Sequence, residues 1–117
     1  MEDNYRYIDL SYLREASKDR AFLKRILSVF GEEYLELKEE LFQMFEEENY
    51  EALEDSLHKA KSSVLMTTVP EARKRIIEIE HLVKKRENRK LQKTSLDEFI
   101  KFCNLAMKEV DHAAKTI

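Results

Sequence analysis

Residues that interrupt helices are almost missing from this sequence. Its 117 residues include one glycine, Gly31, and one proline, Pro70. A β fold would lack the turn residues that join its strands. Glu, Lys, Leu and Ala dominate instead, and these residues are among the most favourable in a helix. The sequence therefore predicts an all-α fold.

Apolar residues recur every three or four positions, which is the spacing of amphipathic helices. The pattern predicts a short helix around residues 8–13, with Asp9 as a possible N-cap and an end near Ser17. Longer helices are expected at about 19–47, 50–66 and 70–85. Gly31 lies inside the first of these long helices, where we expect a slight bend or a close helix contact.

The last helix is expected to begin at Thr94 or Ser95, because Glu98 follows Ser95 at the spacing of a capping box. The polar residues 85–90 before it are interpreted as a loop or a frayed helix end. All connections are short, which favours antiparallel neighbours. We therefore expect residues 1–117 to form a single domain, an antiparallel up-and-down four-helix bundle with a short extra N-terminal helix.

Charge and apolar content exclude several classes of protein. The 21 basic and 24 acidic side chains nearly cancel to a net charge of -3, so general nucleic-acid binding is not indicated. No apolar run approaches the ~20 residues that cross a bilayer, and no secretory signal is visible at the N-terminus. The single cysteine, Cys103, cannot form an internal disulfide. We expect a cytoplasmic protein with no membrane partner.

The helix predicted at 50–66 carries a histidine on its outer side. Leu53, Leu57, Ala60 and Val64 form the inner stripe, and His58 points about 130° away from their mean direction on a helical wheel. His58 is therefore predicted to face water. Its neighbours on the same strip are Glu51, Glu54, Lys61, Ser62 and Leu65.

An exposed imidazole in this setting is suited to carrying a phosphoryl group. Its ring nitrogen is nucleophilic when neutral and is a good leaving group when protonated. The ammonium group of Lys61 could neutralise part of the added charge, and the small Ser62 would let a partner's backbone approach. Leu65, two turns after His58, is what an apolar docking contact needs.

The string Leu57-His58-Lys59-Ala60-Lys61-Ser62-Ser63 resembles the signature of histidine-phosphotransfer domains, in which His is followed by Lys three residues later and then by a small residue. The order of helices along the chain is similar as well. Two departures are Ser62, where the family most often has Gly, and Thr67-Thr68, where a Gly-containing turn is common. These departures would alter partner choice more easily than they would abolish the chemistry.

The resemblance implies a four-helix bundle that exchanges a phosphoryl group reversibly with the Asp of a receiver domain. His58 would be the phosphoryl acceptor and donor, Lys61 its charge support, and Glu54, Ser62 and Leu65 partner contacts. The implied partners are response-regulator receiver domains and a hybrid sensor histidine kinase. No Gly-rich phosphate loop is present, so we expect a phosphoryl carrier rather than an enzyme with its own ATP site. We also expect a monomer without cofactor or metal.

Two other functions stay open at the level of sequence. The chain could be a helical interaction module in which His58 is never phosphorylated. It could also bind a metal, since Glu78 and His81 have the Glu-x-x-His spacing of di-iron bundles and Asp55 and His58 imitate it. The metal hypothesis requires inward-facing ligands, whereas His81 is expected beside the inner stripe and His58 faces away from it.

Overall fold

The computed structural model describes residues 5–67 and 70–117, with the backbone alone for residues 63–67. Within these ranges the regular elements are helices, which confirms the prediction of an all-α fold. They are α1 (Ser11–Ala16), α2 (Arg20–Glu46), α3 (Tyr50–Thr67), α4 (Pro70–Lys85) and α5 (Arg89–Thr116). None of the described helices is long and apolar enough to cross a membrane.

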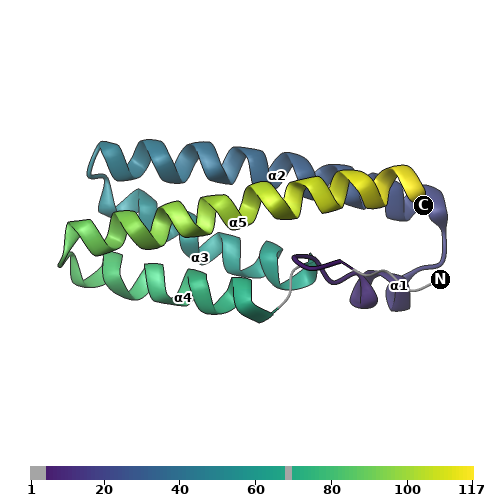
Figure 1. The fold of residues 1–117 in the computed structure, drawn as a ribbon, viewed down its shortest axis with the longest axis horizontal. Coiled ribbons are helices and arrows are strands. Elements are labelled where there is room, and N and C mark those ends of the chain that lie inside the picture. The colour runs from purple at the N-terminus through teal and green to yellow at the C-terminus, as the bar shows by residue number, and fades with distance from the viewer. Residues whose placement is uncertain (1–4, 68–69) are drawn as a thin grey trace.

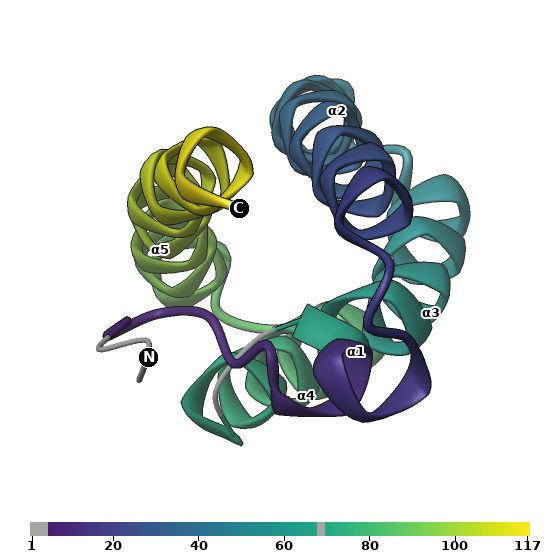
Figure 2. The same ribbon diagram turned by 90° about the vertical axis from the view of Figure 1, so that its right-hand side faces the viewer.

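The helices pack into an elongated body of 45 × 20 × 20 Å. α2 contacts α3 and α5, and α4 contacts the same two helices from the other side. Neighbouring long helices run in opposite directions, and α2 and α5 extend beyond the α3–α4 pair (Figure 1). α1 lies beside the part of α2 and α5 that extends beyond the α3–α4 pair, and it contacts α3 (Figure 2). On their outer sides, α4 and residues 50–62 of α3 carry exposed side chains.

One continuous apolar core joins all of these helices. Leu53, Leu57 and Ala60 are buried, which confirms three positions of the inner stripe predicted for α3, while the side chain of Val64 lies outside the described residues. Fully burying a Leu or Phe side chain contributes about 1.5–3 kcal/mol. The largest completely buried side chains include Leu27, Leu41, Ile76, Ile79, Leu96 and Phe99.

Polar side chains mark where the earlier helices begin. Asp19 precedes α2, and its carboxylate accepts the N–H groups of Ala21 and Phe22 at 3.0 and 3.3 Å. Asn49 caps α3 in the same way. α1 begins at Ser11, later than expected, so Leu10 rather than Asp9 directly precedes it.

Asp9 still supports the start of α1. Its carboxylate accepts hydrogen bonds from the hydroxyl and the N–H of Ser11, and these bonds lower the pKa of Asp9. α2 passes through Gly31 without a break, and Gly31 lies against Val110 of α5. The close helix contact expected there is therefore present.

The predicted start of the last helix at Thr94 or Ser95 is wrong. α5 begins at Arg89, and Asn88 caps it in the left-handed conformation, with its side chain accepting the N–H of Leu91. Thr94 instead donates its hydroxyl proton to the carbonyl of Lys90, one turn earlier in the same helix. The chain therefore reverses in a tight turn between α4 and α5.

Contacts across this turn explain why the helix starts early. The guanidinium group of Arg89 lies 4.1 Å from the ring centre of Phe45 and donates to the Phe45 carbonyl at 2.9 Å. Gln92 is buried, and its amide donates to the Glu87 carbonyl at 2.9 Å. Arg89, from the polar stretch, and Gln92 thus hold this end of the helical body together, so the stretch is not a frayed helix end.

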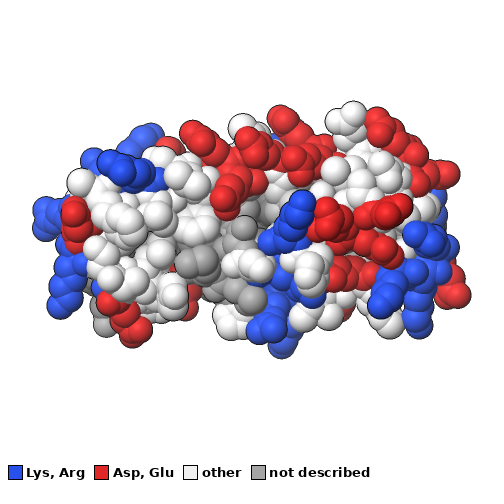
Figure 3. All heavy atoms as spheres, turned by 180° about the vertical axis from the view of Figure 1, so that it is seen from behind, with Lys and Arg blue, Asp and Glu red and all other residues white. Residues whose placement is uncertain are grey.

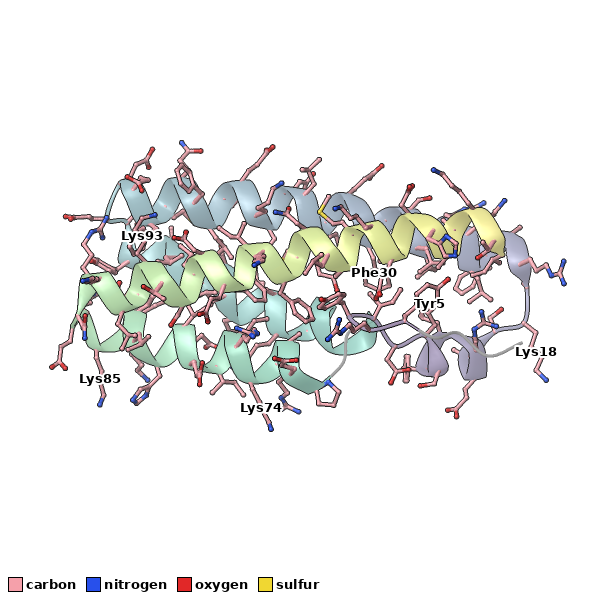
Figure 4. All side chains as sticks on the ribbon, in the orientation of Figure 1. Tyr5, Lys18, Phe30, Lys74, Lys85 and Lys93 are labelled. Carbon is pink, nitrogen blue, oxygen red and sulfur yellow. The ribbon has the colours of Figure 1, made fainter. Side chains whose placement is uncertain are left out.

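The segment before α1 is held against α5 by one carboxylate. Glu109 accepts the N–H groups of Arg6, Tyr7 and Ile8 at 2.9, 2.7 and 3.1 Å. The ring of Tyr7 packs edge-on against Phe102, and Tyr5 lies beneath the C-terminal part of α5 (Figure 4). Tyr5 and Tyr7 therefore pack against the apolar core at this end.

Candidate functional site

His58 lies on the outer side of α3. Leu57 before it and Ala60 after it are buried, whereas the imidazole is exposed, as the wheel predicted. Within the part of the chain that the structure describes, no group forms a hydrogen bond or ion pair with its ring. Both ring nitrogens are therefore available to solvent or to a partner.

His58 opens into a shallow hollow of about 810 Å³ between α3 and α4. Both helices line it, so the hollow follows the junction between them. The lining side chains from α3 and its N-cap are Asn49, Glu51, Ala52, Glu54, Asp55, His58 and Lys61, and those from α4 are Ile77, Glu80, His81 and Lys84. Ile77 is 47% exposed and lines the same hollow as His58, so this surface includes an apolar contact.

Lys61 is engaged across this hollow. Its Nζ atom lies 3.0 Å from Oε1 of Glu80 on α4, and the two side chains are only 29% and 24% exposed. Lys59, on the other side of His58, forms a far more exposed ion pair with Asp55 at 3.2 Å. Of these two lysines, Lys61 is therefore the one that is held within the hollow.

The structure brings together three of the five residues that the sequence assigned to the site. His58, Glu54 and Lys61 line the hollow, with Glu54 partly buried. Ser62 is exposed but is not part of the lining. The side chain of Leu65 lies outside the described residues.

Sequence reasoning did not assign any residue of α4 to the phosphoryl-transfer site. Ile77, Glu80, His81 and Lys84 all line the hollow. The sequence did contain a signal for these residues. When two helices are antiparallel and the chain reverses at Pro70, residues that are equally far from Pro70 in the sequence lie opposite each other. That rule pairs Lys61 with the region of Glu80.

The sequence predicted that His81 lies beside the inner stripe of its helix. The structure shows instead that His81 is exposed. In the described residues, no three His, Cys, Asp or Glu side chains come together as a metal-binding group. Cys103 is completely buried, and this burial raises the pKa of its thiol to about 12. A thiolate nucleophile at that position is therefore not available near neutral pH.

The surroundings of the site are rich in carboxylates. Figure 3 shows the back of the molecule, where acidic side chains gather along α2 and near its connection to α3. A protein that docks over the hollow would meet a rim with four carboxylates, those of Glu51, Glu54, Asp55 and Glu80, and two lysines, Lys61 and Lys84. Basic side chains on the partner would complement it and speed association.

The site thus presents an unpaired nucleophilic ring, a nearby cation and an apolar contact on an open surface. Such a group can accept and release an electrophile that a partner delivers, but the described residues offer no phosphate-binding loop. Comparison with protein-family models, curated proteins and solved structures finds no match for this chain.

Proposed function

We propose that this chain is a histidine-phosphotransfer domain. In this proposal residues 1–117 form a single cytoplasmic domain, an antiparallel four-helix bundle with an extra N-terminal helix. It acts as a phosphorelay intermediate between receiver domains, one of them attached to a hybrid sensor histidine kinase. It carries the phosphoryl group and has no ATP site of its own.

One observation carries the proposal. The His58 imidazole is exposed and unpaired among the described residues, and it shares a hollow with Lys61. An imidazole that exchanges a phosphoryl group with a partner protein needs exposure and a free ring nitrogen, and His58 has both. The sequence signature around His58 gives this exposed ring its chemical interpretation.

The transfer step needs little from this chain beyond His58. The lone pair of a ring nitrogen attacks the phosphorus of an aspartyl phosphate, the P–O bond breaks, and the bonding electrons leave with the aspartate. The phosphorylated ring then loses its remaining N–H proton to solvent. The receiver supplies the metal ion and most of the transition-state stabilisation. The reverse reaction passes the group to the Asp of a second receiver.

Docking would use the open sides of α3 and α4. Ile77 provides an exposed apolar contact, and Glu54 lies on the same wall as His58. Leu65 would extend this surface along α3, and Ser62 would allow a close backbone approach. The carboxylate-rich rim favours receivers with basic side chains around their phosphorylated Asp.

Transfer from a receiver domain phosphorylated on its Asp tests the proposal. The receiver should lose its label to the wild-type chain, while His58→Gln should accept none. His112→Gln is the matched control, because His112 is also exposed but lies on α5 near the C-terminus. Equal transfer to wild type and His58→Gln would reject the proposal.

The second candidate is an interaction module that is never phosphorylated. The 47% exposure of Ile77 beside the hollow favours it, since an apolar side chain on an open surface suits protein binding without any chemistry. Ile77→Asp should weaken binding to a receiver in both cases. His58→Gln separates them, because it would abolish transfer but leave pure binding intact.

A further inference from the structure

The ion pair between Lys61 and Glu80 is the least exposed of those described. Its side chains are 29% and 24% exposed, whereas every other described pair includes a side chain that is more than half exposed. It also joins two helices, since Lys61 lies on α3 and Glu80 on α4. Lys61 is therefore not freely available to a group attached to His58.

His58 and Glu80 compete for the same ammonium group once His58 is phosphorylated. Residues three apart on a helix have Cβ atoms about 5–6 Å apart, so Lys61 can reach a group on the His58 ring. A phosphoryl group brings a charge of about -1.5 to -2 on protein side chains, more than the single charge of a carboxylate. Lys61 must then leave Glu80 or be shared between the two anions.

We infer that Glu80 sets how strongly Lys61 supports phosphorylated His58, by holding Lys61 Nζ in the ion pair that spans α3 and α4. This inference rests on the proposed function and adds a regulator of the same site. Glu80 does not touch the reacting atoms. It is a positioning residue that acts through Lys61, and its own negative charge adds to the repulsion of the phosphoryl group.

The inference predicts the effect of removing the Glu80 charge. Glu80→Gln keeps the shape of the side chain and releases Lys61 to the phosphoryl group. A positive charge that moves closer lowers the pKa of a neighbouring acid. The acid dissociation constant of the phosphohistidine should therefore rise about threefold, the size expected for one partly exposed charge pair.

Chemical labelling separates this test from the relay itself. Potassium phosphoramidate phosphorylates histidine without a partner protein, since a ring nitrogen attacks its phosphorus and ammonia leaves with a proton. The ³¹P chemical shift of the phosphohistidine is then followed against pH on the folded 117-residue chain, and its midpoint is measured. The His58 signal is assigned as the one missing in His58→Gln.

The test uses two single variants, their combination in a double-mutant cycle, and one control. Glu80→Gln should lower the midpoint, and Lys61→Gln should raise it. Adding Glu80→Gln to Lys61→Gln should have clearly less effect than it has alone, because the cation through which Glu80 acts is gone. Asp111→Asn is the control, because it removes an acidic charge that pairs with Lys115 at 3.1 Å near the C-terminal end of α5. It should leave the midpoint unchanged.

Three results would overturn the inference. They are an unchanged midpoint in Glu80→Gln, an equal shift with and without Lys61, and an equal shift in Asp111→Asn. A loss of the predicted shift with normal transfer from a receiver rejects the role of Glu80 alone. The predicted shift without transfer from any receiver rejects the relay and leaves the coupling between Glu80 and Lys61 standing. Failure of His58 to take the label from both phosphoramidate and every receiver would reject both.

Discussion

Replacing Glu109 by alanine should release the N-terminal segment and destabilise the whole domain. This carboxylate accepts three consecutive backbone N–H groups at 2.7–3.1 Å, which tie residues 6–8 to α5. Each hydrogen bond to a charged group contributes about 1.5–3 kcal/mol, but the one from Arg6 is exposed and contributes less. Water can also solvate part of the released backbone. A total loss of roughly 2–3 kcal/mol is therefore expected.

Thermal unfolding followed by circular dichroism measures this loss. A domain of this size loses about 4 °C in Tm for each kcal/mol, so Glu109→Ala should unfold roughly 10 °C below wild type. Hydrogen exchange should speed up at the amides of Arg6, Tyr7 and Ile8. Glu109→Gln should lose less, because its amide oxygen still accepts, and Lys108→Ala is the control at an exposed neighbour. An unchanged Tm together with unchanged exchange at these amides would refute the reasoning.

Two more predictions concern α2 and α5. Gly31→Ala should stabilise the domain by about 0.5–1 kcal/mol in denaturant unfolding, because alanine favours the helix. The added Cβ would lie 3.8 Å from Val110 Cγ1, which is an ordinary contact. A loss of stability would show that the α2–α5 contact is tighter than this distance implies. Cys103 should resist thiol reagents in the folded protein and react on unfolding. Because its pKa is raised from 9.0 to about 12, the folded state keeps a proton that the unfolded chain releases, so this contribution to stability is full below pH 9 and is lost as the pH rises toward 12. The unfolding free energy should therefore fall less steeply above pH 9 in Cys103→Ala than in wild type, and equal slopes would contradict the shift.

Local sequence signals placed most helices correctly. α4 runs from Pro70 to Lys85 as predicted, because proline favours the first turn of a helix and the apolar stripe continues to Val83. Asp19 and Asn49 cap their helices through contacts within a few residues. Signals of this range can be read directly from a sequence.

The start of α5 could not be read in this way. The basic stretch and the Ser95–Glu98 spacing suggested a loop and a later cap, but Arg89 is fixed by Phe45 on α2. Residues so far apart in the chain meet only after the helices have packed. The local capping pattern was therefore outweighed by tertiary contacts that periodicity does not report.

The same limit applies to the site. A helical wheel was sufficient to place His58 and Lys61 on one exposed side of α3. It could not show that Lys61 reaches Glu80 or that Ile77 lines the same hollow as His58, because both depend on how α4 packs against α3. The contribution of α4 is thus the part of the site that came from the structure.

The most direct test of the account is to locate the phosphoryl group. The chain is incubated with a phosphorylated receiver domain, digested at neutral or alkaline pH, and sequenced by tandem mass spectrometry. A histidine-phosphotransfer domain with its site at His58 should carry an acid-labile phosphoryl group on His58 and none on His81 or His112. A label on either of those histidines with none on His58 would contradict it.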